Sequence, residues 1–314
     1  MTDRSDPQAR PVIAVGTGRC GTHFLTELFQ SECGAHACHE SDPLNESFHR
    51  YCQWNRLSVD DGGFLEIKRR EIESARMQGK VFFEASAYLS LSIGKLFDAF
   101  RPRFILITRN PIDTINSLWA KGWYEVAYHK RNGRAPVGYH AVGAPHHFFS
   151  RLVPHGTEFQ DWQALCRIGK LGWFWSALHR RILAQFAELP KESWTIVKLE
   201  HLDYNAYLYL TEFAGIRTGL SIDRFHAISE RRPGALPTRR LFRSWSAQEV
   251  QELTGQVASV ARLLGYDTDL FARWNQVQHM DLQPGETHSH EHLTADERQA
   301  SSVSFPGRCQ ETTY

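Results

Sequence analysis

The stretch from residue 12 to residue 29 constrains the fold more than any other part of the sequence. It opens with the apolar run Val-Ile-Ala-Val, which has the length and composition of a buried strand. Gly16, Gly18 and Gly21 follow, where a side chain would keep the backbone from closing on a ligand. Phe and Leu then recur at helical spacing. A strand, a glycine loop and a helix in this order gather backbone N–H groups at a helix N-terminus, so the stretch predicts a phosphate-binding loop.

The loop differs from the standard ATP-binding loop, in which Lys and then Ser or Thr follow the last glycine directly. Here Thr22 follows Gly21, and the only cation in the loop is Arg19. This argues against a metal-dependent kinase. The dinucleotide-binding pattern G-x-G-x-x-G also fits the loop, and Glu40, about 20 residues further on, leaves that alternative open. A glycine-rich turn without a ligand is the third interpretation.

Composition narrows the class of protein. Among 314 residues, 42% are hydrophobic and 23% charged, which predicts a globular chain with a sizeable core. The 36 Lys and Arg residues nearly equal the 35 Asp and Glu residues, so a nucleic-acid partner is not expected. We find no apolar signal segment and no apolar run long enough to span a membrane. The six cysteines match neither a disulfide scaffold nor a zinc ribbon, and a cytoplasmic protein with reduced thiols is expected.

Strand-like and helix-like stretches alternate along the chain. The strand-like stretches are residues 12–15, 35–38, 81–83, 104–108 and 194–199. This alternation predicts an α/β fold with a mostly parallel central sheet flanked by helices on both faces. We expect residues 1–282 to form one such domain with an insertion at 122–160, and residues 283–314 to form a polar, disordered tail. The charged run within a predicted helix at 64–77, Lys68 included, is expected to face solvent.

Polar residues follow several of these strands, where ligands of parallel sheets bind. Arg19, Glu40, Glu84 and Arg109 each come just after a predicted strand. Ser117 lies eight residues after Arg109, about two turns into the next helix, so both side chains can bind one anion. The alternative for Arg109 is a salt bridge with Asp113 at the start of that helix. Together with the glycine loop, this arrangement predicts a ligand phosphorylated at two places.

These motifs resemble those of sulfotransferases that use 3′-phosphoadenosine 5′-phosphosulfate. Gly18-Arg-Cys-Gly-Thr22 is similar to their 5′-phosphosulfate loop, and Arg109-Asn-Pro-Ile-Asp-Thr-Ile-Asn-Ser117 to their 3′-phosphate motif. Residues 197–202 resemble a strand-end signature of the same fold, and residues 264–266 its closing helix end. The resemblance covers residues 11–268 and implies a P-loop-like three-layer α/β sandwich.

The resemblance implies transfer of a sulfuryl group to a hydroxyl or amine acceptor, with release of 3′,5′-ADP and without a metal. Residues implied to hold the 5′-phosphosulfate are Gly18, Arg19, Cys20, Gly21, Thr22 and His23. Arg19 would also neutralise the bridging oxygen as the sulfuryl group leaves. Arg109 and Ser117 would hold the 3′-phosphate, and Arg239, Arg240 and Arg243 are candidates to complete that site. A P-loop kinase and a non-catalytic nucleotide-binding protein are the alternative functions.

Sulfuryl transfer needs a group that accepts the acceptor's proton. Glu40 is the first candidate, because sulfotransferases acting on tyrosine or heparan-type sugars carry a base glutamate in a comparable region; its alternative role is to cap the following loop. His39 is a second candidate, expected on the opposite strand face from Glu40. Glu84-Ala-Ser-Ala-Tyr88 resembles a carbohydrate sulfotransferase segment in which Lys stands where Ala85 does, so Glu84 and Ser86 are candidate contacts. Glu84 is also a third candidate for the base, and Tyr88 is expected in the core. The acceptor stays open between a small molecule, a sugar and a peptide, and so does the oligomeric state.

Overall fold

A computed structural model describes residues 10–125, 145–231 and 242–280. Its sheet has five parallel strands in the order β2-β3-β1-β4-β5. The strands are β1 (Val12–Val15), β2 (Ala35–His39), β3 (Val81–Ala85), β4 (Arg103–Thr108) and β5 (Trp194–Lys198). All five were predicted, with bounds that differ by at most two residues. The predicted α/β class with a mostly parallel sheet is confirmed.

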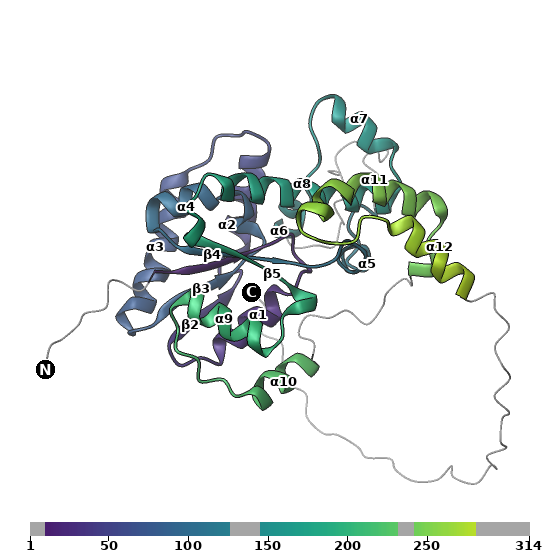
Figure 1. The fold of residues 1–314 in the computed structure, drawn as a ribbon. Coiled ribbons are helices and arrows are strands. Elements are labelled where there is room, and N and C mark those ends of the chain that lie inside the picture. Colours follow the sequence, from purple (N-terminus) through teal and green to yellow (C-terminus); the bar gives the residue numbers. More distant parts are fainter. Residues whose placement is uncertain (1–9, 126–144, 232–241, 281–314) are drawn as a thin grey trace, which may run out of the picture.

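Helices cover both faces of the sheet, which gives three layers (Figure 1). One face carries α1 (Thr22–Gln30), α9 (Tyr204–Ala214) and α10 (Ile222–Arg231), and the other α4 (Ile93–Phe100), α8 (Arg167–Ala187) and α11 (Ala247–Leu263). Strand side chains alternate between the two resulting cores: Val12 and Ala14 of β1 pack in one, and Ile13 and Val15 in the other. Strands buried on both faces read as continuous apolar runs, which is why they were visible in the sequence.

The other helices join and flank these layers. They are α2 (Pro43–Trp54), α3 (Asp61–Met77), α5 (Pro111–Ala120), α6 (Pro145–Ser150), α7 (Thr157–Ala164) and α12 (Leu270–Met280), with short 3₁₀ turns η1 (Tyr88–Leu91), η2 (Lys191–Ser193), η3 (Leu199–His201) and η4 (Phe242–Ser244). Helices α2, α10 and α12 were not predicted. Residues 162–189, whose apolar residues recur at helical spacing, belong to two helices, α7 and α8, which are separated at residues 165–166. Regular structure also occurs in the expected insertion, as α6 and the start of α7.

Helix α5 has a well-defined start beside the glycine loop. Asn110 precedes it, and its side-chain Oδ1 accepts a hydrogen bond of 2.9 Å from the backbone N–H of Asp113. Pro111 occupies the first helical position, where its missing N–H costs nothing. Because β4 is a central strand next to β1, this start is fixed at the edge of the sheet where the glycine loop also lies.

One expectation from the sequence needs correction, and others concern residues that the structure does not describe. Lys68 does not face solvent: its side chain is 1% exposed, because it points from α3 toward the ends of β2 and β3. Arg239, Arg240, residues 126–144 of the expected insertion and the expected tail (283–314) lie outside the residues that the structure describes. In the part of the chain that it does describe, no helix is both long enough and apolar enough to cross a membrane.

Candidate functional site

The glycine loop joins β1 to α1 and leaves the start of that helix open. Gly21 precedes α1 with a φ of 104°, and a Cβ there would lie 2.6 Å from Leu199 Cδ1. A Cβ on Gly16 would lie 2.6 Å from the backbone oxygen of Ile107. Both positions therefore require glycine. Gly21 has no side chain with which to cap the first N–H groups of α1, so these donors can bind the oxygens of a phosphate group. This backbone fits the predicted 5′-phosphosulfate group.

Arg19 and Ser117 bring the two sequence motifs together. Arg19 has a φ of 58°, a left-handed conformation that is unusual for a residue with a side chain. Its Nε donates a hydrogen bond of 2.8 Å to the Oγ of Ser117, which is buried in the second turn of α5. Residues 98 positions apart thus meet at one edge of the sheet. The sequence had assigned them to opposite ends of one ligand, and the structure shows them in contact.

Arg109 lies at the end of β4 beside the same loop. Its Nη2 is 3.2 Å from Asp113 Oδ2, the salt bridge named above as the alternative to anion binding. Its backbone oxygen accepts a hydrogen bond of 3.3 Å from Trp175 Nε1. The guanidinium also lies close enough to Cys20 to oppose the rise in that thiol's pKa, which burial brings to about 11. Arg109 is therefore oriented by Asp113 near the loop, on the α5 side.

The strand-end signature at 197–202 supports the start of α5 from the other side. Glu200 Oε1 accepts hydrogen bonds from the backbone N–H of Asn110, at 2.8 Å, and from its side-chain Nδ2, at 2.7 Å. Its Oε2 accepts a hydrogen bond of 3.2 Å from the hydroxyl of Tyr266, just past α11. Lys198 Nζ donates to the backbone oxygen of Gly265. The two further segments of the family resemblance therefore meet beside Arg109.

His39 and His23 form a stacked pair on the β2 side of the loop. Their ring centroids are 3.7 Å apart, and His39 Nε2 lies 2.9 Å from Thr22 Oγ1. Burial, together with the neighbouring His23, lowers the pKa of His39 to about 4. The imidazole is therefore neutral at physiological pH. It orients the Thr22 hydroxyl at the first residue of α1.

Glu40 follows β2 directly and turns back toward His39. Its φ of 45° is left-handed, and its Oε2 lies 4.0 Å from His39 Nδ1, so the expectation that the two side chains point to opposite faces was wrong. The strand periodicity behind that expectation ends at His39. Burial raises the pKa of Glu40 to about 7, although the Arg50 guanidinium and the Ala87 N–H oppose the rise. Asp42, and not Glu40, caps the following helix.

Sequence reasoning missed two cations beside Glu40. Arg50, buried on α2, donates through Nη1 to the backbone oxygen of Ala87 at 2.9 Å and lies over the Tyr88 ring at 5.0 Å. No signal identified it, because α2 itself was not predicted. Lys121 caps the C-terminus of α5, where its side chain is exposed. Partial burial, together with Arg19, lowers the pKa of Lys121. Lys121 follows Ser117 by four residues, so helical spacing places both on the same face of α5, and this spacing could have identified Lys121 from the sequence.

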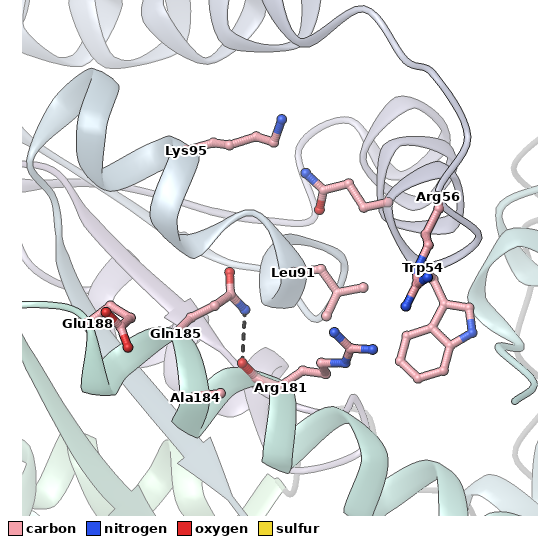
Figure 2. A pocket seen from close by; sticks show the side chains of 9 residues that line it. Trp54, Arg56, Leu91, Lys95, Arg181, Ala184, Gln185 and Glu188 are labelled. Atoms are coloured by element: carbon pink, nitrogen blue, oxygen red, sulfur yellow. Dashed lines mark hydrogen bonds between the residues drawn. The ribbon is translucent and has the colours of Figure 1, made fainter. Parts of the chain in front are cut away.

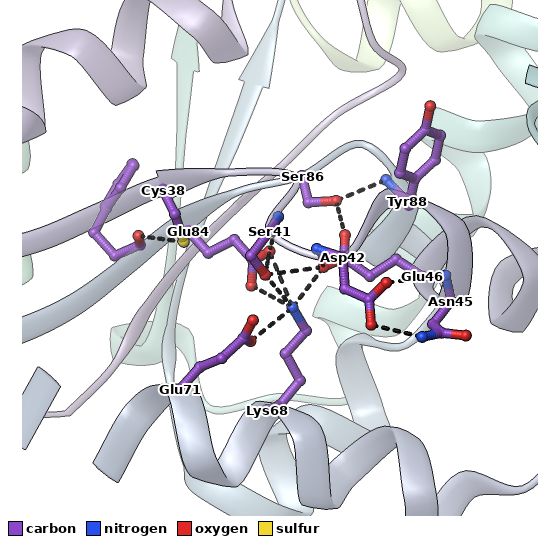
Figure 3. Close-up of polar contacts among 11 residues, drawn as sticks. Cys38, Ser41, Asp42, Asn45, Glu46, Lys68, Glu71, Glu84, Ser86 and Tyr88 are labelled. Carbon is purple, nitrogen blue, oxygen red and sulfur yellow. Dashed lines mark hydrogen bonds and ion pairs between the residues drawn. The ribbon is translucent and has the colours of Figure 1, made fainter. Parts of the chain in front are cut away.

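Glu84 and Ser86 are not available to a ligand, which corrects their expected role as contacts. Both are fully buried at the end of β3. Glu84 binds Lys68 Nζ at 2.8 and 3.0 Å, and the Ser86 hydroxyl donates to Glu46 Oε2 at 2.6 Å (Figure 3). Tyr88, expected in the core, is partly exposed beside Glu40 and Arg50.

A separate cavity of about 640 Å³ opens between the end of α2, η1, α4 and α8 (Figure 2). It is lined by Gln53, Trp54, Arg56, Leu91, Lys95, Arg181, Ala184, Gln185 and Glu188. Arg181 lies over the Trp54 ring at 5.4 Å, and Lys95 pairs with Asp61. None of the residues predicted from the sequence lines this cavity, so it is distinct from the candidate site around Arg19.

Comparisons with known proteins bear on the fold. No protein-family model matches the sequence, and neither does any curated protein. The structure is similar to that of the sulfotransferase STF9 from Mycobacterium avium, with 13% identity, a TM-score of 0.53, and coverage of 83% of this chain and 78% of that one. Sulfotransferase domains from the curacin biosynthetic pathway and from the Synechococcus PCC 7002 olefin synthase align over 82% and 85% of this chain, each with 11% identity and a TM-score of 0.41. The similarity to STF9 shows that the chain has the sulfotransferase fold.

Proposed function

We propose that the protein is a sulfotransferase that moves a sulfuryl group from 3′-phosphoadenosine 5′-phosphosulfate to a hydroxyl or amine acceptor and releases 3′,5′-ADP. The hydrogen bond between Arg19 and Ser117 is the observation that carries this proposal. It joins a phosphate loop that has an arginine, in place of the usual Lys-Ser/Thr pair, to the helix that follows Arg109. A donor with a 3′-phosphate and a 5′-phosphosulfate needs both groups of residues, whereas ATP needs only the first.

The donor's two ends are assigned to different residues. The backbone N–H groups from Gly18 to His23, including Cys20 and Gly21, together with the Thr22 hydroxyl, would hold the 5′-phosphosulfate at the open start of α1. Arg109 and Ser117 would hold the 3′-phosphate, the guanidinium as a two-pronged donor and the hydroxyl as a single one. Arg239 and Arg240 stay candidates for the same phosphate. When bound, the donor supplies an activated sulfuryl group.

Glu40 is the best candidate for the general base. A carboxylate with a pKa near 7 is basic enough to accept a proton and still ionised in a large fraction of molecules at neutral pH. His39, with its pKa lowered to about 4, is a much weaker base and is already bound to Thr22. Glu84 is buried against Lys68. The environments of the three candidates therefore favour Glu40.

The proposed step is a single in-line displacement. A bond forms between the acceptor oxygen or nitrogen and sulfur, while the bond between sulfur and the bridging oxygen of the 5′-phosphate breaks. The acceptor's proton passes to the Glu40 carboxylate. Arg19 neutralises the charge that develops on the departing phosphate oxygen, at a loop where fixed donors need little reorganisation. Lys121, close to both Arg19 and Glu40, adds positive charge between the donor and acceptor sides.

Isothermal titration calorimetry with 3′,5′-ADP, 5′-AMP and Mg-ATP tests the donor assignment. We expect 3′,5′-ADP to bind at least about tenfold more tightly than 5′-AMP, because only the former carries the 3′-phosphate that Arg109 and Ser117 would contact. Tighter binding of Mg-ATP would support the kinase alternative and overturn the proposal. Binding of 3′,5′-ADP without sulfate transfer from labelled donor, across a panel of phenols, sugars and tyrosine peptides, would point to a non-catalytic nucleotide-binding protein.

A further inference from the structure

A buried lysine lies beneath the loop that carries Glu40. Lys68 on α3 is 1% exposed and donates through Nζ to Glu46 Oε1 at 2.5 Å, to both Glu84 oxygens at 2.8 and 3.0 Å, and to Ser41 Oγ at 2.9 Å (Figure 3). Glu71, one turn along α3, lies 3.0 Å from the same nitrogen. Four elements therefore meet at one ammonium group: β2 through its following loop, α2, α3 and β3.

The charges of this cluster are arranged around Glu84. Burial opposes ionisation of Glu84, but the Lys68 ammonium together with the hydrogen bonds from Glu46, Lys68 and the Ser41 N–H lowers the pKa of that carboxyl. Burial and the nearby Glu84 raise the pKa of Glu46, whose Oε2 accepts a hydrogen bond from Ser86. The ammonium thus serves one ionised buried carboxylate. A buried ion pair of this kind gives little net stability compared with an apolar replacement, so its value lies in the geometry that it specifies.

That geometry concerns the residue next to Glu40. The backbone N–H and the hydroxyl of Ser41 both donate to Glu84 Oε1, at 3.1 and 2.9 Å, and Lys68 donates to the same hydroxyl. The N–H of Glu40 bonds the backbone oxygen of Ala85 at 3.1 Å. Glu40 has a left-handed φ, which a residue with a side chain keeps only where its surroundings hold it. The hydrogen bonds on Ser41 and Glu40 are such surroundings.

We propose that Lys68 is a positioning residue: through Glu84 and Ser41 it holds Glu40 at the edge of the sheet, facing the glycine loop. Lys68 does not itself touch the donor or the acceptor, because its ammonium is enclosed by the cluster. The catalytic part of this inference rests on the proposed function, in which Glu40 is the base. The structural part is that Lys68 fixes the position of Glu40, and this part does not depend on whether Glu40 is the base.

Carbon-13 NMR of glutamate-labelled protein tests the structural part without an acceptor. The Glu40 carboxyl signal is assigned by its loss in Glu40→Gln and titrated in wild type, Lys68→Met and Lys68→Arg. In Lys68→Met we expect the midpoint of Glu40 to fall by about one pH unit or more, toward the ordinary value of a glutamate, as the loop opens to water. Lys68→Arg, which keeps the charge, should restore part of the shift. Val257→Ala, in the distant core of α11, is the control for general destabilisation and should leave the midpoint unchanged.

An unchanged Glu40 midpoint in folded Lys68→Met overturns the proposal. Should Lys68→Met fail to fold, Ser41→Ala decides, since it keeps the Lys68–Glu84 pair and removes only the hydroxyl link: a lowered midpoint supports the proposal and an unchanged one overturns it. Once an acceptor is found, Lys68→Met should lower kcat about tenfold or more while the Kd for 3′,5′-ADP stays within about twofold. If wild type does not bind 3′,5′-ADP, the proposed function fails, and the titration still tests the positioning.

Discussion

The Arg19 side chain donates a 2.8 Å hydrogen bond to the buried Ser117 hydroxyl, and this contact ties the loop after β1 to the second turn of α5. Because β1 and β4 are neighbours in the sheet, the two segments leave it side by side. The hydrogen bond therefore couples the positions of the two side chains. A substitution at one of the two residues should therefore also change how the other contacts a bound ligand. The first two predictions follow from this coupling.

Ser117→Ala should weaken binding of 3′,5′-ADP by about tenfold, since one hydrogen bond to a charged group is lost. Calorimetric titration measures this effect. Binding of 5′-AMP, which has no 3′-phosphate, should change much less. An equal loss for both nucleotides would mean that Ser117 acts only by holding Arg19.

Arg19→Ala should lower turnover at least about a hundredfold, because a fixed donor at the point of charge development is removed. Release of 3′,5′-ADP from the donor, with an acceptor found by screening, measures it. Arg69→Ala, an exposed arginine on α3, is the matched control and should keep normal turnover. Near-normal turnover in Arg19→Ala would contradict the loop assignment. In the double variant, the effects of Arg19→Ala and Ser117→Ala should not add, since the two side chains are in contact.

Glu40 should make the stability of the protein depend on pH. Its pKa is about 7 in the folded chain, above the ordinary value of 4.5, so the folded state binds the extra proton between these two values. The stability that this proton contributes is complete below pH 4.5 and is lost as the pH rises through 7, and it amounts to about 3 kcal/mol. Thermal melting at pH 5 and pH 8 should therefore show a larger fall for wild type than for Glu40→Gln, by roughly 5 °C.

The same titration has a catalytic consequence with the opposite sign. As a general base, Glu40 acts only when ionised, so kcat/KM should rise with pH and level off above about 7. A rate that is flat from pH 5 to pH 8 would remove Glu40 from this role. Such a flat profile would instead fit His39 as the base, because its pKa of about 4 puts its titration below this range.

Much of the fold could be predicted because the strands are buried on both faces and therefore read as apolar runs. Helix α2 could not, and the reason lies in its buried side. That side carries Glu46, His49 and Arg50 among its buried residues, so hydrophobic periodicity has nothing to detect. Only Asp42 before Pro43 marks the start of the helix, and these two residue types are equally typical of a loop.

The residues of the candidate site likewise fall into those that the sequence predicted and those that it did not. Arg19, Glu40 and Arg109 were found because each comes within a few residues of the end of a predicted strand, and the strands' shared direction brings them to one edge. Lys68 was misread as part of a solvated charged run. Its neighbours Arg69 and Arg70 are exposed, but its own partner Glu84 is 16 residues away on another element. The local sequence shows which side chains are charged, but it does not show which of them form ion pairs with residues that are distant in the sequence.

Lys121 gives a test of the charges around Glu40. Its ammonium favours the ionised form of that carboxyl, so Lys121→Met should raise the pKa of Glu40. The rise of kcat/KM with pH should then move to higher pH, and kcat should fall as positive charge near Arg19 is lost. Lys80→Met, on the turn that follows α3, is the control and should leave the profile in place. An unmoved profile in Lys121→Met would place Lys121 outside the site.

Gly21→Ala should destabilise the protein and abolish donor binding together. The alanine Cβ would have to enter a left-handed backbone with a φ of 104° and lie 2.6 Å from Leu199 Cδ1. Strain at such a position costs of order 1–3 kcal/mol, and relief by movement of the loop would displace the N–H groups at the start of α1. Thermal melting and titration with 3′,5′-ADP measure the two effects.

Gly94→Ala is the matched control, because no heavy atom lies within 4 Å of the Cβ that it adds near the start of α4. In a helix this substitution should be neutral or stabilise the protein by about 0.5 kcal/mol, and nucleotide binding should stay normal. If Gly21→Ala binds 3′,5′-ADP as well as Gly94→Ala does, the open start of α1 is not the phosphate site. The contrast between the two glycines thus separates the loss of a required backbone conformation from the mere addition of a methyl group.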